Sequence, residues 1–246
     1  MDYDALMSLI TSRRSTRRYK RDPVPLDMVM QVLEAGRWAP SGDNSQPWDF
    51  VVVRDEDKRK QVMEILIESG RQCREACPRF TFIRPEKLEA ATTLIFVCAD
   101  RRFLAAYPRS ADDHELADMY EENAERILIE SVTFSIALIN LAAVSLGLGT
   151  VFFSGPGEQM TSEKLKAVLH VPEPLQILCC LPLGYPEEGP QSSFVQGDRC
   201  PRPLESMVHM DEFDRQKWRN QDVIDKHMLI GKKAWAHFYR TGNMEE

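Results

Sequence analysis

The sequence predicts a single domain that mixes helices and strands. Four short apolar runs are typical of strands, and they alternate with longer segments whose apolar residues recur at helical spacing. A chain of 246 residues with 43% hydrophobic residues can bury one large core. These observations favour one main domain over several small ones.

The first two predicted helices enclose a cluster of arginines. The first helix leads directly into the cluster and is marked by three apolar residues: Leu6, Leu9 and Ile10. The cluster should therefore lie at or just beyond a helix end. A second helix is expected over residues 26–35, with Pro25 before it and Gly36 after it. Its apolar face should consist of Leu26, Val29, Met30 and Leu33.

The remaining elements follow in order along the chain. The expected strands are Phe50–Val53, Thr93–Cys98, Thr150–Phe153 and Ile177–Leu183. The expected helices lie between Asp57 and Ser69, over most of Leu116–Leu146, and in a short segment from Thr161. Residues 70–90 should be irregular and cover the site. A last apolar stripe should dock on its own domain or on a second subunit: Ile224, Met228, Gly231, Trp235 and Phe238.

Charge and targeting signals narrow the possible partners. Asp and Glu outnumber Lys and Arg by 38 to 31, a net charge of −7, which argues against nucleic acid as a partner. The start of the chain lacks the features of a secretion signal, so we expect a cytoplasmic protein. Residues 131–153 carry no charge, but Gly147 to Gly149 indicates a helix end followed by a strand. A buried core helix is therefore predicted there, and no membrane contact.

Metal and hydrolase chemistry find little support. The five histidines are scattered, no Cys-x-x-Cys pair is present, and no Gly-x-Ser-x-Gly elbow occurs. Adjacent Cys179 and Cys180 should point to opposite faces of a strand, and the six cysteines are expected to be reduced and mostly buried. We therefore expect no metal site.

Two segments carry the ligand-binding chemistry. The first, residues 13–21, is rich in arginine forks that suit a phosphate, with Ser15 adding a hydroxyl donor. The second is a turn-rich loop at residues 39–48. In this loop Pro40, Ser41 and Gly42 allow close backbone approach, while Asn44 and Gln46 offer both donors and acceptors to a planar ring system. Together the two segments suggest a flavin mononucleotide (FMN) site.

The two segments, in this order, resemble the nitroreductase family of flavin enzymes, which includes the iodotyrosine deiodinases. The resemblance covers about residues 8–210, with weaker support from Leu146–Gly149 and Leu181–Pro186. It implies an α+β fold with a central mixed, mostly antiparallel sheet surrounded by helices. It also implies an interlocked homodimer with FMN at each subunit interface. Residues 1–210 would form the FMN-binding domain and 211–246 a helical extension.

The resemblance also assigns roles to individual positions. Phosphate and ribityl contacts fall to Arg13, Arg14, Ser15 and Arg17. The loop that reaches the flavin, often from the other subunit, corresponds to Pro40, Ser41, Gly42 and Asn44. Donors near the flavin N5 and O4 correspond to Ser154 and Gly155. A late phosphate-binding residue corresponds to Arg202, with Arg199 as the other candidate because Pro201 separates the two.

The implied activity is a two-stage transfer of reducing equivalents. NADH or NADPH would deliver hydride to flavin N5, and an electron-poor acceptor such as a nitroaromatic or quinone would then collect the electrons. No catalytic side chain is required. One alternative is reductive dehalogenation, for which Glu68, Lys87 and Tyr107 are candidates to clamp an amino-acid substrate. Another is a protein that binds or consumes flavin without nicotinamide-linked turnover.

Overall fold

The computed structural model describes residues 2–76, 84–106, 114–188 and 201–224. The chain divides into two compact units, Met1–Gln191 and Ser192–Glu246. The first unit contains the sheet and the helices around it. It therefore holds both segments to which the sequence assigns ligand binding, at residues 13–21 and 39–48.

The described strands form one four-stranded antiparallel sheet in the order β1-β2-β4-β3. Their bounds are Trp48–Val53 for β1, Thr93–Asp100 for β2, Gly149–Thr150 for β3 and Leu175–Gly184 for β4. A parallel bridge between Ser15 and Thr150 adds one more stretch of chain beside β3. The predicted α+β fold with a mostly antiparallel sheet is confirmed.

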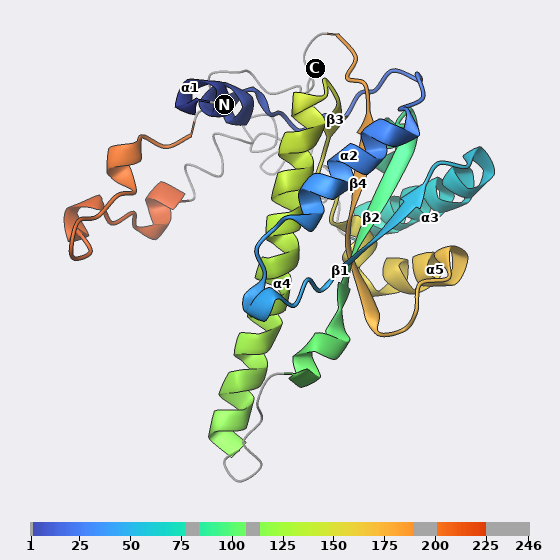
Figure 1. Ribbon diagram of the computed structural model, residues 1–246. Helices are drawn as coiled ribbons and strands as arrows, with labels where there is room; N and C mark the ends of the chain where they lie inside the picture. Colours follow the sequence, from blue (N-terminus) through green and yellow to red (C-terminus); the bar gives the residue numbers. More distant parts are fainter. Residues whose placement is uncertain (1, 77–83, 107–113, 189–200, 225–246) are drawn as a thin grey trace. The chain divides into compact units, whose positions relative to one another are not determined.

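Helices cover both faces of this sheet (Figure 1). One face carries α2 (Leu26–Arg37) and α4 (His114–Ser145), and the other carries α3 (Glu56–Ala76) and α5 (Gln159–Leu169). Alternate residues of β2 and β4 enter the two cores, as the period of two in a strand requires. Cys179 belongs to the core under α4 and Cys180 to the core under α3 and α5, which confirms their predicted opposite orientations.

The four cysteines within the described residues are free thiols. Cys98, Cys179 and Cys180 are buried, and Cys73 is partly buried. Burial raises the pKa of the Cys98 thiol to about 12, so it stays protonated near neutral pH. Reduced and mostly buried thiols were expected. Cys77 and Cys200 lie outside the described residues.

The packing of α2 on α4 corrects the predicted face of the second helix. Val29, Val32 and Gly36 are the buried residues of α2, whereas Leu26 and Met30 are more than half exposed. Gly36 lies inside the helix rather than after it. A Cβ on Gly36 would lie 2.6 Å from Ile139 Cγ1, so the missing side chain lets the two helices approach closely.

Helix α4 is long and apolar enough to cross a membrane by length and composition. Its inward residues nevertheless belong to the core shared with α2 and the sheet: Leu128, Val132, Ile136, Ile139 and Ala143. The helix ends at Ser145 and is followed by β3, as the glycines after it predict. α4 is thus a core helix of this fold, and 39% of its most apolar 18-residue stretch is buried within one chain.

Two predicted boundaries are wrong. Helix α3 continues to Ala76 instead of ending near Ser69, and a short 3-10 helix occupies Pro85–Leu88, so residues 70–90 are not irregular throughout. The third strand is only Gly149–Thr150, although Phe153 still forms an isolated bridge to Cys180. Residues 77–83 lie outside the described residues.

The described part of the second unit contains two 3-10 turns, Leu204–Ser206 and Arg215–Lys217. Phe213 stacks on His209, with ring centroids 4.1 Å apart, and meets Trp218 edge to face. Residues 225–246, with most of the predicted apolar stripe, lie outside the described residues.

We predict that Gly36→Val lowers the free energy of unfolding by about 1–3 kcal/mol, because the added side chain overpacks the contact with Ile139. Met30→Ala, on the exposed side of the same helix, is the control and should change it by less than about 0.5 kcal/mol. Chemical denaturation of both variants measures the difference. Equal stability of the Gly36 variant and the parent chain would refute the close crossing.

Candidate functional site

The arginine cluster begins where α1 (Tyr3–Ser12) ends, as the sequence predicts. From Ser15 the chain runs along the outer side of β3 and the end of β4. The Thr16 amide donates to the Thr150 carbonyl at 2.9 Å, and the Lys20 amide donates to the Tyr185 carbonyl at 2.8 Å. These backbone bonds fix the segment at both ends, in the manner of a short additional strand.

Two glycines make room for this segment. Gly149 and Gly184 are paired across β3 and β4. A Cβ on Gly149 would lie 2.2 Å from Thr16 Oγ1, and one on Gly184 would lie 3.0 Å from Tyr19 Cδ1. Thr16 and Tyr19 therefore fill the space that side chains at the two glycines would occupy. We call this paired surface of Gly149 and Gly184 the glycine floor.

Tyr19 is a buried anchor, with only 1% of its surface exposed. Its hydroxyl lies 2.6 Å from the Thr16 carbonyl and 3.2 Å from the Pro182 carbonyl, which ties the turn to β4. Burial raises the pKa of this phenol far above its usual value, although the charge of Arg17 opposes part of the rise. The hydroxyl therefore stays protonated near neutral pH and can donate a hydrogen bond.

The arginines lie around this anchored backbone. Arg14 Nη1 donates to the Thr11 carbonyl at 2.5 Å and to the Arg13 carbonyl at 2.9 Å, so it caps the end of α1. No described residue accepts from the Nε and Nη2 edge of this guanidinium. Arg13 and Arg14 are exposed and Arg17 is half-buried. Arg13 and Arg14 thus place guanidinium donors at the surface, and such donors fit a phosphate dianion.

Ser154 and Gly155 follow β3 in the chain. Ser154 follows Thr150 by four residues, an extended reach of at most about 14 Å. Gly155–Gly157 forms a 3-10 turn, and no described residue accepts a hydrogen bond from the backbone N–H of Ser154 or Gly155. Two such donors suit the electron-rich edge of a planar ring. Their assignment to the ring edge of the cofactor stays a prediction.

The polar loop contains a short 3-10 turn, Gly42–Asn44. Three of its residues, Asp43, Asn44 and Gln46, adopt positive φ angles between 48° and 52°. The Gly42 amide donates to Ser131 Oγ of α4 at 3.1 Å, and the Gln46 amide donates to Ser41 Oγ at 3.0 Å. Backbone strain of this kind is held only where the surroundings enforce it. Pro40, Asn44 and Gln46 are exposed.

The loop and the arginine segment are not brought together within one chain. Trp48, which follows the loop, begins β1 at one edge of the sheet, and Thr150 lies in β3 at the other edge. The strand registers place the two residues at diagonally opposite corners, about 27 Å apart for regular strand spacings. Helix α4 contacts the polar loop through Ser131 and β3 through Asn140, two residues about 14 Å apart along its axis.

Of the two arginines predicted to bind the phosphate from late in the chain, the structure describes one. Arg202 lies in the second unit, where its guanidinium donates to the Ser206 carbonyl at 2.6 Å. Arg199 lies outside the described residues. Their assignment to the phosphate stays a prediction.

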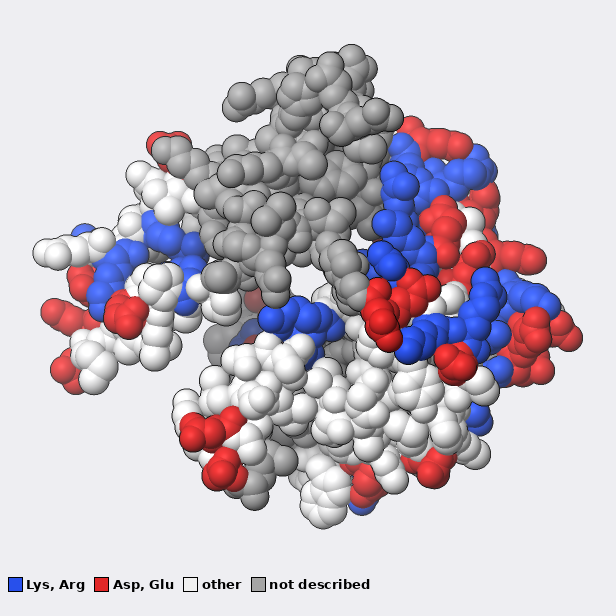
Figure 2. Space-filling view, turned by 90° about the horizontal axis from the view of Figure 1, so that it is seen from above, with Lys and Arg blue, Asp and Glu red and all other residues white. Residues whose placement is uncertain are grey.

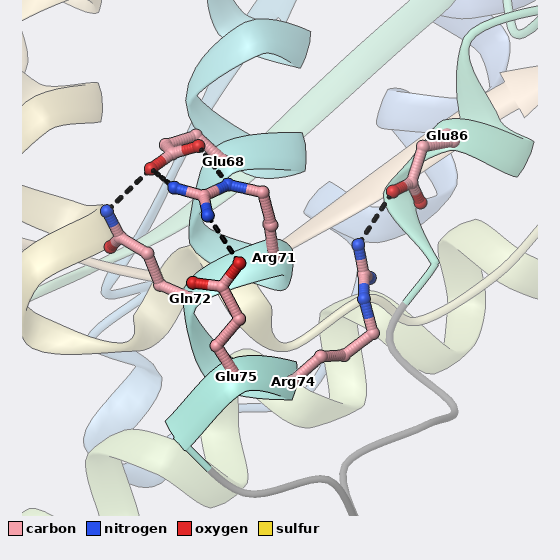
Figure 3. A network of polar contacts seen from close by, with 6 residues as sticks. All are labelled: Glu68, Arg71, Gln72, Arg74, Glu75 and Glu86. Carbon is pink, nitrogen blue, oxygen red and sulfur yellow. Dashed lines mark hydrogen bonds and ion pairs between the residues drawn. The ribbon is translucent and has the colours of Figure 1, made fainter.

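Glu68, one of the residues predicted to hold an amino-acid substrate, is already hydrogen-bonded to neighbouring side chains of α3. Both carboxylate oxygens of Glu68 accept hydrogen bonds from Arg71, at 2.7 and 2.8 Å, and one also accepts from Gln72 (Figure 3). Arg71 holds the pKa of Glu68 below its usual value. Arg74 pairs with Glu86 at 2.9 Å and so links α3 to the Pro85–Leu88 turn. Tyr107 lies outside the described residues, and Lys87 lies on that turn.

The surface charge is mixed. On the face shown in Figure 2, acidic side chains are interleaved with the basic ones among the described residues. No group of three or more His, Cys, Asp or Glu suited to a metal occurs in the part of the chain that the structure describes.

Sequence reasoning missed the residues that hold the site in place. Thr16 and Tyr19 lie inside the arginine segment and Thr150 lies in β3, and their buried polar groups fix the segment, a role that the sequence did not assign to them. The available signal was the pair of glycines, Gly149 and Gly184, each at the end of an apolar run. Their pairing across the sheet is not visible in a single sequence.

Comparisons with known proteins agree on one family. The family model described as Nitroreductase family matches residues 10–185. An FMN reductase [NAD(P)H] of Bacillus subtilis is 27% identical over 96% of this chain and 84% of its own length. An NADH dehydrogenase of Thermus thermophilus is 30% identical over 72% of this chain and 84% of its own. A crystal structure of oxidized iodotyrosine deiodinase bound to FMN and 3-iodo-L-tyrosine superposes with a TM-score of 0.61 and 26% identity, covering 85% of this chain and all of that one.

We predict that Ser131→Ala loosens the polar loop, because it removes the acceptor for the Gly42 amide. The free energy of unfolding should fall by about 1 kcal/mol, and exchange of the Gly42 amide with solvent should accelerate. Thr133→Ala, which removes an exposed hydroxyl bonded to its own helix, is the matched control. The same exchange rate at Gly42 in both variants would contradict the anchoring role.

Proposed function

The chain belongs to the nitroreductase family, and from this premise we propose that it is an FMN-dependent oxidoreductase that takes electrons from NADH or NADPH. The acceptor would be an electron-poor small molecule such as a nitroaromatic or a quinone. The observation that carries the proposal is the arginine segment, fixed on the glycine floor with Arg13 and Arg14 exposed to solvent. The named relatives support flavin-linked redox chemistry.

The proposed roles follow from the donors each segment offers. Arg13, Arg14 and Arg17, with Ser15, would hold the FMN phosphate through charge-assisted hydrogen bonds. The amides of Ser154 and Gly155 would orient the ring edge. FMN, when bound, supplies hydride acceptance and donation, so the protein contributes orientation, electrostatics and exclusion of water. The cationic forks would also favour a negatively charged reduced cofactor.

A second copy of the chain would complete the site. The polar loop lies far from the arginine segment of its own chain, so Pro40, Ser41, Gly42, Asn44 and Gln46 would reach the cofactor held by the partner. The outward side of α4 supports such pairing, because Phe134 is 53% exposed on a helix of this apolarity. We propose a homodimer with shared sites, soluble in the cytoplasm.

Reductive dehalogenation is the second candidate, because the superposed deiodinase structure is matched over its whole length. The engagement of Glu68 with Arg71 and Gln72 weighs against a substrate clamp at that residue. Turnover of halotyrosines measured beside turnover of nitroaromatics separates the two activities.

The experiment that tests the proposal is the absorbance spectrum of the purified protein during anaerobic addition of NADH or NADPH. We expect a flavin band that bleaches with one of the two nucleotides and returns with a nitroaromatic or quinone acceptor. A colourless protein that cannot be reconstituted with FMN would refute the proposal. A flavin band that neither nucleotide bleaches would shift it to the dehalogenase or to a protein that only binds or consumes flavin.

We predict that Arg14→Ala weakens FMN binding by about 10- to 100-fold, which is the change in affinity expected from the loss of one charge-assisted hydrogen bond. Binding of riboflavin, which lacks the phosphate, should change little. Arg37→Ala removes an exposed arginine that pairs with Glu34 on α2, and it should leave both affinities unaltered. Fluorescence titration measures the affinities, and full FMN affinity in the Arg14 variant would count against the phosphate assignment.

A further inference from the structure

A path of polar contacts runs from α4 to the arginine segment. Asn140 of α4 donates to the Ile136 carbonyl at 2.7 Å and accepts a hydrogen bond from the Thr150 hydroxyl. The Thr150 carbonyl accepts from the Thr16 amide, and the Thr16 carbonyl accepts from the Tyr19 hydroxyl. We call this path the anchor relay.

The relay consists of buried groups. Thr16, Tyr19 and Thr150 are each at most 4% exposed. A buried hydroxyl is costly unless its hydrogen bonds are satisfied, and a phenylalanine or a valine would fill the same space without that cost. Filling the core therefore does not explain why Tyr19 and Thr150 carry hydroxyl groups.

The anchor relay holds the backbone of Thr16, which lies between two residues that are proposed to contact the phosphate. The Thr16 amide and carbonyl are both held, and Ser15 and Arg17 are the residues on either side of Thr16. Each of these neighbours changes direction if the Thr16 peptide groups rotate. A hydrogen bond to the Thr16 carbonyl thus fixes the orientation of two ligand residues together.

We propose that Tyr19 is a positioning residue for the phosphate site, holding Ser15 and Arg17 in their binding geometry before the cofactor arrives. This inference rests on the proposed function, because it takes the arginine segment to be the site of the FMN phosphate. Preorganisation of this kind raises affinity by removing an ordering cost at binding. It acts on the phosphate end of the ligand and leaves the ring contacts unchanged.

The test compares two tyrosine-to-phenylalanine variants of the full-length protein. Tyr19→Phe removes the hydroxyl of the anchor relay. Tyr185→Phe is the matched control. Tyr185 is the residue after Gly184 of the glycine floor, and its hydroxyl contacts Met28 Sδ of α2 at 3.6 Å. Flavin is removed from each protein by dialysis, and FMN and riboflavin are titrated in turn.

We expect Tyr19→Phe to weaken FMN binding by about 3- to 10-fold and riboflavin binding by less than about 2-fold, as for one neutral hydrogen bond. The control should alter neither affinity. A structural role alone would weaken both flavins equally. Equal weakening of both, or no change in either, would overturn the inference.

Two further outcomes keep the test decisive. If the Tyr19 variant does not fold, Thr150→Val removes the bond to Asn140 while it keeps the Thr150 carbonyl, and it should lower the FMN-to-riboflavin affinity ratio in the same way. An unchanged ratio in that variant overturns the inference. If the parent protein itself shows no preference for FMN over riboflavin, the phosphate assignment in the proposed function fails, and the inference fails with it.

Discussion

The close approach of the arginine segment to the sheet depends on two absent side chains. Gly149 and Gly184 face each other across β3 and β4, and Thr16 and Tyr19 occupy the space above them. Without this floor the segment would have to lift away from the sheet edge, and its backbone bonds to Thr150 and Tyr185 would be lost. The position of the proposed phosphate contacts at residues 13–17 therefore follows from a steric constraint rather than from charge.

Helix α4 connects the two ligand-binding segments. Its inner side packs on α2 and the sheet, Ser131 holds the polar loop, and Asn140 holds Thr150 beneath the arginine segment. The two segments nevertheless belong to opposite corners of the sheet. The proposed site, built from both segments, would need two copies of the chain, and the apolar outer side of α4 would then serve assembly as well as the core.

Three of the four strands were predictable because short apolar runs between turn residues mark them, whereas the third strand is shorter than its apolar run. The arginine segment and the polar loop were predicted as ligand-binding from residue types and from the family resemblance. The buried face of α2 could not be predicted in this way. Its close contact with α4 is made at Gly36, and a pattern of apolar side chains cannot reveal a position where the side chain is absent. The last turns of α3 were missed because ion pairs such as Arg71 with Glu68 stabilise them instead of apolar periodicity. The glycine floor joins residues far apart in the chain, and local pattern carries no information on that pairing.

The central claim is that the segment carried by the glycine floor holds the phosphate of FMN. A crystal structure of the full-length protein loaded with FMN tests it most directly. The account predicts a phosphate within hydrogen-bond distance of Arg14 or Arg17, with the Tyr19 hydroxyl still on the Thr16 carbonyl. A phosphate bound away from residues 13–17, or a segment displaced from Gly149 and Gly184, would contradict it.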